Sequence, residues 1–165
     1  MTLSELARAF MPGNPKEHNL GGISISYGEY AFLDRIIVNE ETGHIVGGNG
    51  RVEALLGMKA RGEVPPGGIE RRGSEWIVPV DWVKLEEGKE HGAVLALNRW
   101  EEEGGWKDRD LALWLSELAA EGEEMLRPTG FDMDDVDELL ASLGEANAGG
   151  GTEEDEDDSR SVGGR

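Results

Sequence analysis

The chain of 165 residues contains no cysteine, and this absence excludes disulfide bonds and thiolate metal sites. Aromatic residues are also few, at 6% of the chain. No apolar run approaches the roughly 20 residues that a membrane-spanning helix needs. The N-terminus has neither the basic flank nor the long apolar stretch of a signal peptide. We therefore expect a protein of the reducing cytoplasm that does not enter a membrane.

Basic residues are scarce too, because 16 lysines and arginines face 35 acidic residues and leave a net charge of −19. Residues 145–165 hold seven of the acids and two arginines, so they carry −5 and the remaining chain −14. Such a field repels duplex DNA unless the basic residues cluster. We expect weak non-specific binding to DNA. Removal of the acidic tail should strengthen that binding only in part, because most of the excess negative charge lies in the rest of the chain.

The hydrophobic fraction of 38% suits one domain with a modest core. We predict an α+β domain over residues 1–143, with its core at about 14–102 and a helical extension over 107–143, and a disordered acidic tail over 144–165. Thr2 to Glu5 fits either a helix capping box or a short first strand. The predicted elements are a hairpin over 35–46, helices over 50–61 and 88–102, a strand over 76–82 with Pro79 at an edge or bulge, a helix with Leu111, Trp114, Leu115 and Leu118 on one face, and a last helix through Leu143 that Asp132 caps.

The most informative segment is the end of that hairpin, where three glycines lie among four residues, Gly47, Gly48, Asn49 and Gly50. A helix begins near Arg51, because Val52 and the leucines after it have helical spacing. A strand, a glycine-rich turn and a helix N-terminus together present backbone N–H groups that bind anions, above all phosphate. Arg51 adds a bidentate donor. Two alternatives remain open at this stage, since such a turn also serves as a plain connector and Arg51 also pairs with carboxylates, either Glu53 or a distant acid.

Several motifs follow one another in the order found in one known family. The segment from Gly47 to Leu55 is similar to the Gly-His-Gly-Arg-(Leu/Val)-Glu-Ala stretch of ParB-like domains, which have the ParB/sulfiredoxin fold. The other matching segments are Asn14-Pro15-Lys16-Glu17-His18, Leu97-Asn98-Arg99, Gly104-Gly105-Trp106-Lys107-Asp108 and Thr129-Gly130-Phe131-Asp132. The resemblance spans about residues 14–143, and it is greatest to phage and mobile-element members, which often accompany DNA methyltransferases.

The resemblance implies a small mixed sheet with helices, including a helix around Leu20 to Tyr27 that the local glycines and serines do not favour. It implies that nucleotide or DNA phosphate binds in one cleft, with a nucleoside triphosphate and Mg²⁺ as the ligand. It also implies a role in DNA metabolism beside a DNA methyltransferase or other phage DNA-processing protein, in the host cytoplasm. The residues that it assigns to the cleft are Gly47, Gly48, Asn49, Gly50, Arg51, Asn98, Arg99, Asn14 and His18.

Two departures from the family pattern bear on catalysis. Asn49 replaces a histidine that could act as a general acid or base near neutral pH. Leu97 replaces an aspartate suited to a hard metal ion, and an active enzyme would need this carboxylate from elsewhere, such as Glu101 or Glu102 on the same helix. The sequence reveals no catalytic set, and its three histidines lack metal-ligand spacing. Three hypotheses remain: a nucleotide-binding accessory protein, an active nuclease or nucleotide-dependent phosphotransferase or hydrolase, and a non-catalytic acidic interaction module.

Overall fold

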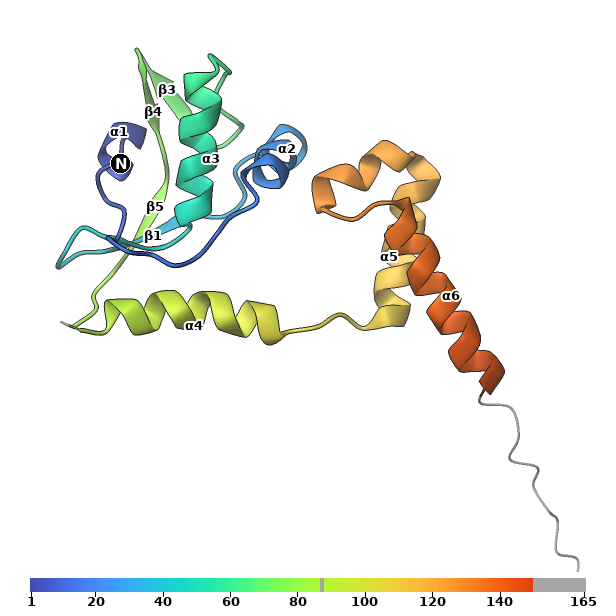
Figure 1. Ribbon diagram of the computed structural model, residues 1–165. Coiled ribbons are helices and arrows are strands. Elements are labelled where there is room, and N and C mark those ends of the chain that lie inside the picture. Colours follow the sequence, from blue (N-terminus) through green and yellow to red (C-terminus); the bar gives the residue numbers. More distant parts are fainter. Residues whose placement is uncertain (87, 150–165) are drawn as a thin grey trace, which may run out of the picture.

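The computed structural model describes residues 1–86 and 88–149 and has a mixed α+β fold, as the sequence predicts. Figure 1 shows two parts, an N-terminal body that contains the strands and a C-terminal helical unit, which we define as residues 107–149. The body holds helices α1 (Leu3–Leu6), α2 (Leu20–Tyr30), α3 (Asn49–Ala60) and α4 (Glu90–Glu103), and strands β1 (Ile36–Asn39), β2 (Ile45–Gly47), β3 (Glu70–Arg72), β4 (Glu75–Ile77) and β5 (Val80–Val83).

The main sheet has three strands in the order β2-β1-β5. Strand β1 is antiparallel to β2, which confirms the predicted hairpin, and parallel to β5. Its residues alternate between the two faces of the sheet. Ile36 and Val38 are fully buried on the face covered by α1 and α3, whereas Ile37 packs in a second cluster with Val94 of α4. The sheet therefore lies between α3 on one side and α4 on the other, and Figure 1 shows this arrangement.

The strand predicted over residues 76–82 is in fact two strands in different sheets. Strand β4 pairs with β3 in a two-stranded sheet, and β5 joins the edge of the main sheet. The interruption falls at Val78 and Pro79, because proline has no N–H for a ladder and restricts the residue before it. Val78 instead exchanges two hydrogen bonds with Met1. The N–H of Val78 donates to the Met1 carbonyl at 2.8 Å, and the terminal amine of Met1 donates to the Val78 carbonyl at 3.1 Å.

The first two helices depend on local caps. Of the two alternatives that the sequence left open for this segment, Thr2 and Glu5 form the capping box, with hydrogen bonds of 2.7 and 3.1 Å, and Thr2 also makes one isolated bridge to Ile77. The glycine-rich helix α2 forms where the family resemblance places it. Asn19 caps α2 by accepting from the N–H of Gly22 at 3.0 Å, and Tyr27 is its buried anchor.

Helix α4 forms within one or two residues of the predicted bounds, and much of its apolar side-chain surface stays exposed. Val94 is the buried residue of α4, whereas Leu97 is 41% and Trp100 71% exposed. The N-terminal half of α4 lies beneath the sheet, and its C-terminal half extends toward the helical unit (Figure 1). The apolar side chains of α4 are therefore buried only in the half of the helix that packs against the sheet.

The C-terminal helical unit contains α5 (Asp108–Glu121), the 3-10 turns η1 (Glu123–Met125) and η2 (Arg127–Thr129), and α6 (Met133–Gly149). It has its own small core of Leu115, Leu126 and Val136. Asp132 caps α6 as predicted, since its carboxylate accepts from the N–H of residue 135 at 3.1 Å. Helix α6 runs to Gly149, so the first six residues of the predicted disordered tail are helical, and the rest of that tail lies outside the described residues.

Candidate phosphate-binding cleft

The glycine-rich turn has the predicted strand, turn and helix geometry. Strand β2 ends at Gly47, Gly48 adopts a left-handed conformation with φ +87°, and α3 begins at Asn49. A Cβ atom on Gly48 would lie 2.9 Å from Cδ1 of Ile36. Both the backbone angle and the close contact therefore favour glycine, and a side chain at position 48 would disturb the fold as well as the turn.

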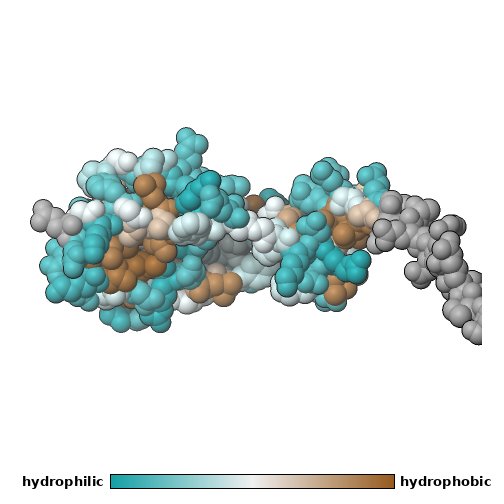
Figure 2. Space-filling model, turned by 90° about the horizontal axis from the view of Figure 1, so that it is seen from below, coloured by the Kyte–Doolittle hydropathy of each residue, from teal (hydrophilic) through white to brown (hydrophobic). Residues whose placement is uncertain are grey.

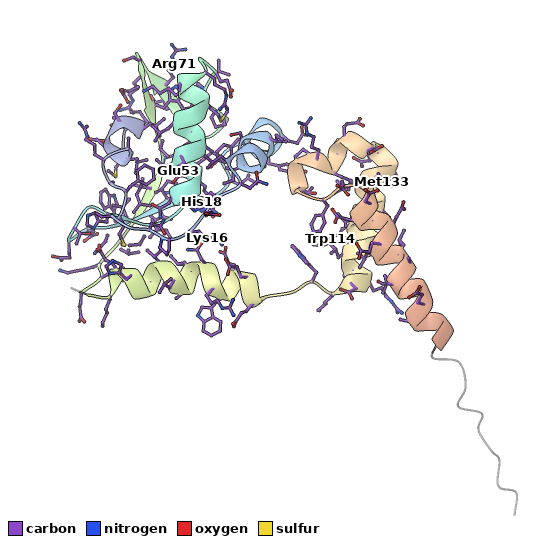
Figure 3. All side chains as sticks on the ribbon, in the orientation of Figure 1. Lys16, His18, Glu53, Arg71, Trp114 and Met133 are labelled. Carbon is purple, nitrogen blue, oxygen red and sulfur yellow. The ribbon has the colours of Figure 1, made fainter. Side chains whose placement is uncertain are left out.

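The N-terminus of α3 carries no side-chain cap. The first N–H groups of an α-helix have no partner within the helix, and the helix dipole gives them partial positive charge. The ring of His18 lies against this first turn, because a Cβ atom on Gly50 would come within 2.5 Å of it. The N-terminal loop is thus fixed beside the start of α3, and Figure 3 shows His18 next to the lower end of that helix.

A cavity of about 420 Å³ opens at this helix start, within the size range of small-molecule sites. Three parts of the body form its walls: the glycine-rich turn, the segment from α2 to β1, and the C-terminal half of α4 with the N-terminal loop. The lining residues are Asn14, His18, Ile23, Ser26, Tyr27, Tyr30, Ala31, Leu33, Asp34, Arg35, Ile37, Val46, Gly47, Gly48, Asn49, Gly50, Arg51, Leu97, Asn98 and Glu101.

The structure brings together every residue predicted for the cleft except Arg99. Arg99 is 64% exposed and forms ion pairs with Glu103 at 2.6 Å and Glu102 at 3.9 Å on its own helix. The structure does not place Arg99 among the lining residues, because adjacent helical residues point about 100° apart and α4 directs Asn98 toward the cleft instead. The amide nitrogen of Asn98 donates to the Val94 carbonyl at 2.7 Å, which leaves its side-chain oxygen for a ligand.

Arg51 forms an ion pair with Asp34, which comes from the segment between α2 and β1. Of the two carboxylate alternatives that the sequence left open, the distant acid is the partner, and Glu53 instead lies 3.7 Å from His18. The Asp34 side chain is 65% exposed and that of Arg51 is 35% exposed, so water screens their attraction. Asp34 therefore holds the Arg51 guanidinium at the wall of the cleft only weakly, and an anion that enters the cleft can compete with Asp34 for it.

Two buried polar atoms in the cavity wall have no hydrogen-bond partner among the described residues, Oδ1 of Asn49 and the hydroxyl of Tyr27. These residues are only 5% and 7% exposed. Burial is the largest effect on the pKa of Tyr27 and raises it. Nearby Arg51 lowers this pKa and Asp34 raises it, and because the net change is upward, the hydroxyl stays protonated and remains a donor. Buried polar groups in folded proteins are nearly always paired with protein or with water, so these two atoms are groups that a ligand or a water in the cavity could satisfy.

Sequence reasoning missed several of these lining residues. The sequence analysis places Tyr27 only in the helix that the resemblance implies, and nothing local indicates that its hydroxyl is unpaired. Asp34 lies in a loop and reaches Arg51 only through the fold. Glu101 was a fallback for the missing carboxylate, and it does line the cavity, whereas Glu102 pairs with Lys16 at the neighbouring surface.

A second polar cluster lies on the other side of the hairpin and is architectural. The Glu90 carboxylate accepts from Asn39 at 2.6 Å and from Thr42, and lies 3.2 Å from Nδ1 of His44. Burial raises the pKa of Glu90, but these hydrogen bonds outweigh it and hold the pKa below its usual range. The cluster joins the hairpin turn to the start of α4 and so fixes the helix that carries Asn98.

Comparisons with protein-family models, curated proteins and solved structures gave no match to this chain. Within the described residues, no helix is both long and apolar enough to cross a membrane. The same part of the chain has no group of three or more His, Cys, Asp or Glu side chains that could hold a metal ion. The chemistry of the cleft itself is thus the basis for any functional assignment.

Proposed function

We propose that this chain is a ParB-like binding domain whose cleft takes the phosphate of a nucleotide at the N-terminus of α3. The observation that carries the proposal is the meeting of the uncapped helix start with two buried, unpaired polar groups, Asn49 and Tyr27, in one cavity. Backbone N–H groups and the protonated Tyr27 hydroxyl can donate to phosphate oxygens, whereas the unpaired Asn49 oxygen can only accept, for example from a hydroxyl or N–H group of the sugar or base. The ordered sequence motifs support the ParB-like assignment, and with it a role in DNA metabolism beside a DNA-modifying enzyme.

A nucleotide suits the cleft better than duplex DNA does. The phosphate donors lie in a recess whose apolar wall includes Ile23, Ile37 and Leu97, which suits a base or sugar. Residues 1–106 hold seventeen acidic and eleven basic residues, a net charge of −6, and this net negative charge disfavours a DNA duplex. Small phosphate ligands need only the local field at the helix start.

Mg²⁺ would fit the cleft only as a companion of the nucleotide. The hard oxygen donors among the lining residues are the side-chain oxygen of Asn98 and the carboxylates of Glu101 and Asp34, the last paired with Arg51. Mg²⁺ in nucleotide sites is commonly held by one or two carboxylates together with the phosphates. The ion would neutralise phosphate charge, while the protein's own contribution is the donor array at α3.

Catalysis is the second candidate, and the lining weakens it. Asn49 and Leu97, which replace the histidine and aspartate of active relatives, both line the cavity. The described residues therefore lack, at these positions, a group that titrates near neutral pH and a metal-binding carboxylate. We accordingly propose binding, with phosphoryl or nuclease chemistry weak or absent in the unmodified chain.

Isothermal titration with ATP, CTP, GTP and inorganic phosphate, each with and without Mg²⁺, tests the proposal. We expect at least one nucleotide to bind, and Arg51→Ala to weaken that binding by tenfold or more. Arg61→Ala is the matched control, because Arg61 lies at the other end of α3 and pairs with Glu63 at 2.5 Å. Absence of binding by all four ligands, or equal binding by both variants, would reduce the turn to a connector.

A further inference from the structure

The C-terminal helical unit has a charge and a surface that the phosphate cleft does not explain. Residues 107–149 contain twelve acidic and three basic residues, so 43 residues carry a net charge of −9. The unit packs around its own core of Leu115, Leu126 and Val136. Figure 2 shows it as a separate lobe, with a largely hydrophilic surface interrupted by hydrophobic patches.

Helix α5 has one face in that core and another face open to solvent. Leu115 is 3% exposed, whereas Leu113 and Trp114 are 57% and 64% exposed, so Trp114 lies outside the buried face on which the sequence predicts it together with Leu115. Figure 3 places Trp114 on the side of α5 away from α6. Tryptophan is among the residues that contribute most to binding interfaces, so an exposed tryptophan with charged neighbours is a candidate contact residue.

Carboxylates flank this apolar pair at helical spacing. Asp110 precedes Leu113 and Trp114 by three and four residues, and Glu117 follows them by four and three, so all four share one face of α5. Asp110 and Glu117 are exposed, and none of the ion pairs within the described residues uses them. We name this stripe of Asp110, Leu113, Trp114 and Glu117 the α5 acidic-aromatic face.

We infer that the α5 acidic-aromatic face binds an arginine-rich segment of a partner protein. A guanidinium group stacks on an indole ring and pairs with carboxylates at the same time, which matches the alternation of acid and tryptophan on this face. Because this unit carries a net charge of −9, a complementary partner segment must be positively charged. Nucleic acid, an anionic lipid surface and a second copy of this chain all carry the same negative sign and are repelled.

The test measures binding of the full chain to a labelled peptide of alternating Arg and Leu by fluorescence anisotropy at 0.15 M salt. We expect Trp114→Ala and Glu117→Lys each to weaken binding about tenfold. Trp100→Ala is the matched control, because Trp100 is an equally exposed tryptophan on α4, outside the helical unit, at 71% exposure. Both tryptophan variants change only surface side chains, and circular dichroism verifies that they fold.

Three results would overturn the inference. Equal binding by Trp114→Ala and Trp100→Ala would mean that the peptide senses only the overall negative charge. Equal binding of a matched peptide with Glu in place of Arg would remove charge complementarity. Self-association that depends on Trp114, measured by sedimentation velocity, would identify a second copy as the occupant. None of these outcomes depends on whether nucleotides bind the cleft.

Discussion

Replacement of Tyr27 by phenylalanine should change stability and affinity in opposite directions. The substitution removes a hydroxyl that is buried and unpaired, and it keeps the ring, which packs against Phe32 with centroids 5.5 Å apart. A buried polar group without a partner costs about 1–3 kcal/mol. We therefore expect the free energy of unfolding of the ligand-free protein to rise by about 1 kcal/mol, or roughly 2–4 °C in Tm for a chain of this size.

The same variant should bind phosphate ligands less tightly. A hydrogen bond to a charged acceptor contributes about 1.5–3 kcal/mol, so the loss of the Tyr27 hydroxyl should weaken nucleotide binding by roughly tenfold or more. Urea denaturation measures the first effect and isothermal titration the second. Tyr30→Phe is the control for stability, because Tyr30 lines the same cavity but is only partly buried and its hydroxyl is not an unpaired buried atom.

The reasoning about Tyr27 fails if the variant is less stable than the parent, since its hydroxyl would then have a partner within the folded protein. It also fails if stability rises while nucleotide affinity is unchanged. In that case the hydroxyl would be a defect of the core rather than part of a binding site.

Four further predictions follow from the same contacts. Arg51→Ala should weaken nucleotide binding by about 1.5–3 kcal/mol, measured by titration, because it removes a charge-assisted contact. Unmodified protein should cleave DNA weakly or not at all with Mg²⁺, and the double substitution Asn49→His and Leu97→Asp should increase cleavage on a gel assay; robust cleavage by the parent would contradict this. Because the pKa of Glu90 is lowered in the folded state, its stabilisation is present above the unfolded carboxyl pKa and is lost as pH falls through the lowered value. Glu90→Gln should therefore flatten the loss of stability in acid, followed by urea denaturation over a pH series. Full-length chain should bind duplex DNA weakly at physiological salt, and deletion of residues 145–165 should help only in part; tight binding in a filter assay would reveal clustered basic residues.

The sequence alone determined the elements that depend on near neighbours. The hairpin of β1 and β2, the glycine-rich turn before α3 and the Asp132 cap all depend on contacts within a few residues. Such contacts depend on backbone conformation and spacing, which residue types encode directly. For that reason the glycine-rich turn could be predicted with its helix, and most of the predicted cleft residues do meet in one cavity.

Only the tertiary structure decided which of these groups are available to a ligand. Asp34 reaches Arg51 across the fold, and α4 rotates Arg99 away from the cleft toward Glu103. The unpaired state of the Tyr27 hydroxyl likewise depends on every element packed around it. These features arise from the relative positions of separate elements, which long-range packing of apolar side chains sets and no local pattern encodes.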